Sequence, residues 1–208
     1  MTEQGGRSGC RSDGEATFGG RPLRAWRLVR CSGCGLPTDR CMCATLPTLA
    51  VRTRVLVVTH RVEAMRSTNT ARLATRMLSG ASTVVRGEAS AGAPEGRRLV
   101  LFPFEDARAL SPDDLGDDLT LVVPDGTWPQ ARRIARRDEL AKGARSVTIP
   151  LRDSAYGLRR HPRPGALCTL EAIAEALRVL EGDEVAEALL EAFVRWRDLS
   201  LAVREGRG

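Results

Sequence analysis

Apolar segments that alternate with helical segments place the strongest constraint on how this chain can fold. Five segments indicate strands, and most of them are apolar along their whole length instead of at every second residue: 51–59, 82–86, 98–103, 119–123 and 145–150. Strands of this kind are buried on both faces, as in a parallel sheet covered by helices. The sequence therefore predicts an α/β fold with a mostly parallel sheet and helices on both faces.

Helical periodicity and capping residues predict the helices of this fold. An apolar stripe at helical spacing lies within residues 69–79. Thr127 and Gln130 stand at the spacing of a capping box, which predicts a helix from there to about residue 141. Two amphipathic helices are expected to end the chain, roughly at 169–180 and 184–203.

Composition divides the chain into three parts. Residues 1–25 are Gly-rich and polar and predict a disordered tail, residues 26–50 hold a cysteine cluster, and residues 51–208 make one α/β domain. No run of 18 apolar residues is present, so neither a membrane-spanning helix nor a membrane partner is expected. The first 25 residues lack the apolar segment of a secretory signal, which makes the cytoplasm the expected compartment.

The net charge of +6 has two competing explanations. The chain has 32 basic against 26 acidic side chains, and Lys142 is the one lysine among them. Arginine binds phosphate, so a polyanionic partner such as RNA is one explanation. Drift toward arginine in a GC-rich genome is the other, and net charge alone does not separate the two.

Four cysteines lie within thirteen residues, in the pattern C-x2-C-x6-C-x-C: Cys31, Cys34, Cys41 and Cys43. In the cytoplasm such a cluster indicates metal binding instead of disulfides. Four thiolates with glycines and a proline between them can surround Zn²⁺ tetrahedrally, and no ligand position stays open, so the zinc would be structural. Ordinary reduced cysteines are disfavoured because their neighbours offer no core for buried thiols. An iron–sulfur cluster is a weaker alternative.

The predicted strand 119–123 leads into an unusual turn. Asp125 and Gly126 precede the helix that Thr127 and Trp128 begin, and in parallel sheets ligands bind beyond the carboxyl ends of strands. Asp125 can act as a cap, contact a ligand or serve as a general base; a plain Asp-Gly turn is the bland alternative. The helix that follows has a basic face, which would hold phosphate if a nucleotide entered the site: Arg132, Arg133, Arg136 and Arg137.

Polar groups also follow the other strands. The long loop 151–167 contains four candidate phosphate ligands, namely Arg159, Arg160, His161 and Arg163. Glu171 lies in the first turn of the next helix, where it either caps the helix or binds a ligand. His60 ends the first strand and is a candidate for ligand or RNA contact.

Taken together and in order, these motifs resemble the DTW-domain family of tRNA-uridine aminocarboxypropyltransferases. The resemblance covers about residues 31–180 and rests on the cysteine cluster, H-R-V-E…S-T-N-T at 60–70, L-F-P at 101–103, D-G-T-W-P-Q-A-R-R at 125–133 and Y-G-L-R-R-H-P…L-C-T-L-E-A at 156–172. One departure is Cys168, where the family tends to have Ser. Because Cys is a poor helix cap, we expect some loss of helix stability there.

The resemblance implies a SPOUT-like domain with a C-terminal trefoil knot and a specific reaction. N3 of a tRNA uridine would attack the γ-carbon of S-adenosylmethionine, and methylthioadenosine would leave. Asp125 is then the candidate that removes the N3 proton. The resemblance places further residues around S-adenosylmethionine: Leu101, Phe102, Pro103, Asp125, Gly126, Thr127, Trp128, Thr169 and Glu171. It places others against RNA: His60, Arg132, Arg133, Arg136, Arg159, Arg160, His161 and Arg163.

Two other functions compete with this one. A methyltransferase would use the same substrate and RNA but give a methylated product. A non-catalytic, zinc-containing RNA-binding protein would bind RNA with strong salt dependence and would not bind S-adenosylmethionine. The sequence does not determine which uridine is modified or whether the protein is a monomer or a dimer.

Overall fold

The computed structural model describes residues 28–88, 92–150, 152–157 and 166–205, and the backbone of a short strand pair near the N-terminus. That pair joins β1 (Thr17–Phe18) and β2 (Arg21–Pro22) in antiparallel register. The rest of the predicted disordered tail, residues 1–25, lies outside the described residues.

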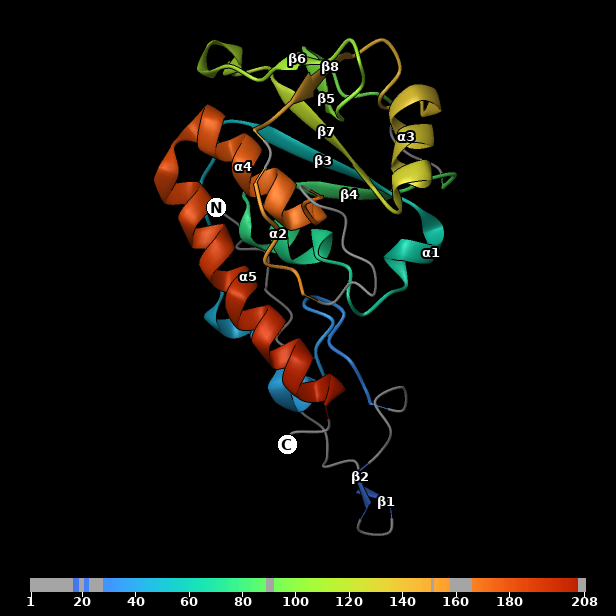
Figure 1. The fold of residues 1–208 in the computed structure, drawn as a ribbon, viewed down its shortest axis with the longest axis vertical. Coiled ribbons are helices and arrows are strands. Elements are labelled where there is room, and N and C mark those ends of the chain that lie inside the picture. Colours follow the sequence, from blue (N-terminus) through green and yellow to red (C-terminus); the bar gives the residue numbers. More distant parts are fainter. Residues whose placement is uncertain are drawn as a thin grey trace, which may run out of the picture.

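A six-stranded sheet forms the centre of the described domain, in the order β4-β3-β7-β5-β8-β6 (Figure 1). Every neighbouring pair in it is parallel. The strands are β3 (Arg54–Thr59), β4 (Ser82–Val85), β5 (Arg98–Leu101), β6 (Arg108–Ala109), β7 (Thr120–Asp125) and β8 (Arg145–Thr148). The predicted parallel α/β sheet is confirmed.

Helices cover both faces of this sheet, as the sequence predicted. One face carries α2 (Ala71–Met77), α4 (Thr169–Glu181) and α5 (Asp183–Arg204), whereas α3 (Trp128–Arg137) lies on the other (Figure 1). A single turn, α1 (Arg61–Ala64), follows β3. The carboxyl ends of the central strands therefore lie between α3 and the start of α4.

The two helical layers produce two apolar cores, because alternate residues of each strand face opposite sides. In β7, Leu121 and Val123 pack with α2, α4 and α5, whereas Val122 packs with Ile134 of α3. Both cores are apolar, which explains why β7 has no polar alternation in its sequence.

Strand β7 continues through Pro124 to Asp125, two residues beyond its predicted end. Pro lacks an N–H and is tolerated where a strand has no neighbour to receive one. The pairing of β5 with β7 ends at Val122, so Pro124 is paired only with β3, in register with Val58. Because β5 no longer pairs with β7 at this point, the proline is tolerated and this edge of the end of β7 has no strand beside it.

Several other elements differ from the sequence predictions. Strand β3 begins at Arg54 and not at residue 51, and β5 and β8 end at Leu101 and Thr148, two residues before their predicted ends. The helix predicted over 69–79 is shorter, because only 71–77 is helical, and α3 ends at Arg137 and not near residue 141. The two-residue strand β6 was not predicted, because two residues give no periodicity. The trefoil knot depends on a path between β8 and α4 that lies partly outside the described residues, so it stays a prediction.

The cysteine-containing segment packs into the main core. Cys34, Leu36 and Met42 are buried in the same cluster as the residues of α4 and α5. The indole Nε1 of Trp196 in α5 donates a hydrogen bond to the Cys34 carbonyl at 2.6 Å. Residues 28–50 thus share the apolar core of the domain that follows them in the chain.

Replacement of Trp196 by Phe should lower the free energy of unfolding. The Cys34 carbonyl would lose its buried donor, at a cost of about 1–3 kcal/mol. Urea unfolding of the metal-loaded protein measures the effect, and Trp128→Phe, at a tryptophan that is 41% exposed, is the matched control, with an expected change within about 0.5 kcal/mol. Equal stability of Trp196→Phe and the unsubstituted protein would contradict the role of this bond.

Candidate active site

A cavity of about 760 Å³ lies at the carboxyl ends of the central strands. Residues that end β5, β7 and β8 line it, as do the segments after them and the start of α4. This size lies in the usual range for small-molecule sites. The carboxyl ends of three predicted strands, 98–103, 119–123 and 145–150, therefore meet around one cavity, at the edge of the sheet where ligand binding was expected.

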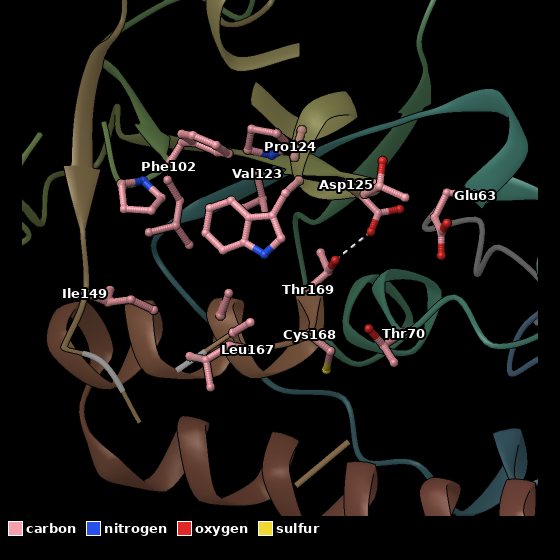
Figure 2. A pocket seen from close by; sticks show the side chains of 18 of the residues that line it. Glu63, Thr70, Phe102, Val123, Pro124, Asp125, Ile149, Leu167, Cys168 and Thr169 are labelled. Atoms are coloured by element: carbon pink, nitrogen blue, oxygen red, sulfur yellow. Dashed lines mark hydrogen bonds between the residues drawn. The ribbon is translucent and has the colours of Figure 1, made fainter. Parts of the chain in front are cut away.

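The carboxylate of Asp125 is the most densely bonded group at this cavity. Asp125 is only 3% exposed. Its Oδ2 accepts hydrogen bonds from the hydroxyl of Thr59 and from Nδ2 of Asn69, the latter at 2.7 Å. Its Oδ1 accepts one from the hydroxyl of Thr169 at 2.5 Å, and Figure 2 shows the carboxylate directed toward that residue. A buried carboxylate requires such donors, and here they come from three separate segments.

The turn after Asp125 requires glycine for two reasons. Gly126 has a φ of +155°, and a Cβ there would lie 3.0 Å from two side-chain atoms of Gln130. Gln130 in turn accepts a hydrogen bond from the Thr127 backbone N–H at 2.8 Å, which completes the predicted capping box of α3. This geometry places Trp128 at the cavity, with its ring edge-on to Phe102 at 5.5 Å between centroids.

Glu171 joins the loop before α4 to the start of that helix. Its carboxylate accepts hydrogen bonds from the Ser154 hydroxyl at 2.6 Å, the Ala155 N–H at 2.6 Å and the Cys168 N–H at 2.7 Å. The reciprocal pairing of a capping box is present between Cys168 and Glu171. The thiol of Cys168 thus stands where the family tends to have a hydroxyl, and the loss of helix stability expected from this cysteine stays a prediction.

The four cysteine thiols form a compact cluster away from the cavity lining. All four Sγ atoms lie within 4.8 Å of one another, with Cys31 and Cys43 3.6 Å apart and Cys34 and Cys41 3.9 Å apart. Tetrahedral Zn–S bonds of about 2.3 Å would place the sulfurs about 3.8 Å apart. The cluster therefore has the dimensions of a site that could hold a metal ion.

Two glycines allow this cluster to close. A Cβ on Gly33 would lie 2.9 Å from the Cys43 sulfur, and one on Gly35, whose φ is +76°, would lie 2.4 Å from the Ser67 carbonyl oxygen. The prediction that no core surrounds these thiols is wrong for Cys31 and Cys34. Both are buried, because distant residues of α5 supply the core.

The surroundings of the thiols differ in their effect on ionisation. Burial raises the pKa of Cys43, and the neighbouring thiols raise it further. Burial also raises the pKa of Cys31, but hydrogen bonds from the Cys34 and Gly33 backbone and with the Cys41 and Cys43 thiols together outweigh it and lower that pKa to about 6. Four ionised thiols at these distances would repel one another strongly, which a bound cation would offset.

Comparison with known proteins assigns the family. The DTW domain family matches residues 28–201, which include the cysteine cluster, the sheet and the cavity. The chain belongs to the DTW-domain family. The resemblance that the sequence motifs indicated is thereby confirmed.

Relatives of this DTW-domain protein span animals and plants. It is 32% identical to "tRNA-uridine aminocarboxypropyltransferase 2" of Drosophila melanogaster, over 74% of this chain and 68% of the fly protein. It is 25% identical to "tRNA-uridine aminocarboxypropyltransferase A" of Arabidopsis thaliana, over 87% of this chain and 84% of the plant protein. Among solved structures it is similar to the SAM-dependent rRNA:acp-transferase Tsr3 from Vulcanisaeta distributa, with 19% identity, a TM-score of 0.46, and 74% and 84% coverage of the two chains.

The DTW-domain structure brings most of the predicted substrate-contacting residues to the cavity. Eight of them line it: Leu101, Phe102, Pro103, Asp125, Gly126, Thr127, Trp128 and Thr169. Glu171 is not part of the lining, because its carboxylate faces the loop before α4. Sequence position alone could not separate Thr169 from Glu171, which lie on the same helical turn.

The predicted RNA-contacting residues are divided. His60 begins α1, where its Nδ1 accepts from the Val62 N–H at 3.3 Å, and its backbone N–H donates to the Asp125 carbonyl at 2.9 Å. The α3 arginines are exposed, namely Arg132, Arg133 and Arg136. The remaining predicted residues lie outside the described part of the chain: Arg159, Arg160, His161 and Arg163.

Several cavity residues received no role from the sequence. Glu63 and Arg66 line the cavity and form an ion pair at 3.2 Å, and Tyr156 donates from its hydroxyl to the Thr68 carbonyl at 2.9 Å. The H-R-V-E…S-T-N-T motif contains Glu63 and Thr68, so the motif was a usable signal. Thr59 does not line the cavity but donates to Asp125. In the sequence it offered only a weak signal, as a polar residue that ends a buried strand.

No membrane-spanning element occurs among the helices of the described residues, since none of them combines the necessary length and apolar composition.

Proposed function

We propose that this protein transfers the 3-amino-3-carboxypropyl group of S-adenosylmethionine to N3 of a uridine in tRNA. The observation that carries the proposal is the combination of a family match across residues 28–201 with a cavity whose lining comes from that family's motifs. Relatives in animals and a plant bear the name tRNA-uridine aminocarboxypropyltransferase.

The reaction is a displacement at carbon. N3 forms a bond to the γ-carbon of the methionine moiety while the bond from that carbon to sulfur breaks. The electron pair goes to sulfur, so methylthioadenosine leaves as a neutral thioether, and the N3 proton passes to a base. Because the sulfonium is already an activated leaving group, the protein has two tasks: to align the two substrates and to accept the proton.

We assign to Asp125 the role of the base that accepts the N3 proton. A carboxylate has about four acceptor positions, and Thr59, Asn69 and Thr169 occupy three of them. The remaining position belongs to Oδ1, which receives only the Thr169 hydroxyl. In this proposal N3–H donates to Oδ1, and the three fixed donors hold the carboxylate in place during the transfer.

The lining of the cavity supports binding of both substrates. Phe102 and Trp128 supply aromatic surface for a base or an adenine, whereas Asp125 and Thr169 supply polar groups on the other side. Leu101, Pro103, Gly126 and Thr127 complete the proposed S-adenosylmethionine site. A uridine can reach it only when it is turned out of the RNA stack.

The arginines of α3 fit the RNA that would carry this uridine. Arg132, Arg133 and Arg136 are exposed on a helix whose first residue, Trp128, lines the cavity. We propose that they bind phosphate, with His60 and the loop residues Arg159, Arg160, His161 and Arg163 as further contacts.

The cysteine cluster is proposed to bind one structural Zn²⁺ through Cys31, Cys34, Cys41 and Cys43. The sulfur spacing supports this metal, and four thiolates leave no position for a substrate. When bound, the ion would hold together a segment that packs on α5 and would take no part in the transfer.

The reaction is tested by mass spectrometry of nucleosides from unmodified tRNA incubated with the purified protein and S-adenosylmethionine. We expect a uridine that bears the aminocarboxypropyl group, together with methylthioadenosine. A methylated nucleoside with S-adenosylhomocysteine would instead identify a methyltransferase. RNA binding without binding of S-adenosylmethionine would identify a non-catalytic RNA-binding protein.

Asp125→Asn should lower the turnover rate by at least about 100-fold, the usual contribution of a general base. The fold should persist, because the amide oxygen can keep the bonds from Thr59 and Asn69 while the Thr169 hydroxyl turns to accept from the new NH2 group. The rate of methylthioadenosine release gives turnover, and calorimetry gives affinity for S-adenosylmethionine, which should be retained. Asp117→Asn is the control, since Asp117 is exposed and precedes the amino end of β7. Full turnover by Asp125→Asn would refute the proton role.

Metal analysis should find one zinc per chain, and Cys43→Ser should lose it and melt at a lower temperature. Cys168→Ser is the matched control, because Cys168 is buried in the cap of α4 and is not one of the four clustered thiols. An unchanged zinc content in Cys43→Ser would contradict this metal site. Detection of iron and inorganic sulfide in place of zinc would identify an iron–sulfur cluster.

A further inference from the structure

A basic groove adjoins the cavity through Phe102 and Phe104, and of its cationic residues only Arg136 has a role in the proposed function. It consists of two adjoining hollows of about 460 and 750 Å³ that share Arg108, Gly143, Ala144 and Arg145. Its walls are the segment from β5 to β6 and the connection from α3 to β8, in the upper part of Figure 1.

Cationic side chains dominate the lining of this groove. They are Arg97, Arg98, Arg108, Arg136, Lys142 and Arg145, whereas Asp106 is the one acidic residue that the described lining contains. Asp114 pairs with Arg97 at 3.2 Å and with Arg108 at 2.5 Å. The hydrogen bond from Arg108 lowers the pKa of Asp114 to about 2, so this carboxylate stays ionised, but it offsets only one of two charges.

Three of the guanidinium groups have no carboxylate partner within the described residues. Arg98 donates to the backbone carbonyls of Leu140 at 3.0 Å and Glu139 at 3.4 Å, which hold its side chain without neutralising it. Arg136 lies over the Phe104 ring at 4.8 Å. Arg145 is exposed at the start of β8, and its guanidinium group makes no hydrogen bond or ion pair with the described residues. The groove therefore presents an uncompensated positive charge.

Aromatic rings connect this groove with the cavity. Phe104 lines the groove and Phe102 lines the cavity, and their ring centroids are 4.6 Å apart. Phe102 also contacts Trp128 at 5.5 Å. An RNA chain whose base enters the cavity could continue past these rings to Arg136. It would reach Arg98 and Arg145 farther along, because those residues begin β5 and β8 whereas the cavity lies at the carboxyl ends of the two strands.

We propose that this groove binds the phosphate backbone of tRNA on one side of the nucleotide in the cavity, through Arg98, Arg136 and Arg145. Arg108 and Lys142 contribute less, because they are paired with Asp114 and Glu139. The inference rests on the proposed function for its choice of RNA. Guanidinium groups bind phosphate oxygens in a bidentate manner, and a row of them follows a polyanion better than a single small anion. These residues extend the basic surface from α3 across the start of β8.

The test measures the affinity of the full-length protein for fluorescently labelled, unmodified tRNA at several salt concentrations. Arg145→Glu should weaken binding by about 10-fold and reduce the slope of log K against log salt by about 1. Arg145→Lys should stay within about 3-fold of the unsubstituted protein because it keeps the charge. Arg204→Glu is the charge-matched control, at an exposed residue that ends α5 at the other end of the molecule (Figure 1).

A second measurement guards against a folding defect in one variant. Bound tRNA should slow amide hydrogen exchange of residues 142–146 in the unsubstituted protein. In the transfer assay, Arg145→Glu should raise the KM for tRNA and leave kcat and the affinity for S-adenosylmethionine unchanged.

The outcomes separate this inference from the proposed function. If product forms normally and Arg145→Glu binds tRNA as tightly as the unsubstituted protein, the groove does not bind tRNA. An equal loss of tRNA affinity in Arg204→Glu would also contradict tRNA binding by the groove. So would the absence of protection from hydrogen exchange at residues 142–146. If no aminocarboxypropyl product forms but the affinity and exchange results hold, the proposed reaction fails and the RNA-binding groove stands.

Discussion

The buried carboxylate of Asp125 is the interaction on which the arrangement of the site depends. A charged group that is 3% exposed must be surrounded by donors, and these come from the end of β3, the segment before α2 and the start of α4. Satisfying one carboxylate therefore brings three distant parts of the chain to the end of β7. The same contacts form the polar side of the cavity, so the stability of this edge and its chemistry have a common cause.

Two further sets of hydrogen bonds hold the elements around that carboxylate. Glu171 binds the Ala155 N–H and the Ser154 hydroxyl, which fixes the loop before α4 against the helix that carries Thr169. Trp196 binds the Cys34 carbonyl, which fixes the cysteine segment against α5. A metal at the cysteines would thus support the C-terminal helical layer, and through it the start of α4, without contacting a substrate.

The charge distribution separates the two tasks of an RNA-modifying enzyme. The cavity combines aromatic rings with one fixed carboxylate, which suits a base and a small molecule. The surface beside it carries guanidinium groups on α3 and around the start of β8. An excess of arginine that composition alone left unexplained is therefore concentrated, in part, where a phosphate backbone would pass.

The sequence by itself determined the parallel α/β sheet, the approximate positions of its main strands along the chain and the family, because continuous apolar strands and ordered motifs are local properties of a chain. The order of the strands within the sheet came from the tertiary structure. The sequence also predicted Asp125, Thr127 and Trp128 at the substrate site and the four cysteines at a metal site. Only the tertiary structure decided which groups contact one another: that Asp125 is bonded to Thr59, Asn69 and Thr169, that Glu171 turns away from the cavity, and that two cysteines are buried. These contacts join residues far apart in the chain, and their geometry follows from packing, which no local pattern encodes.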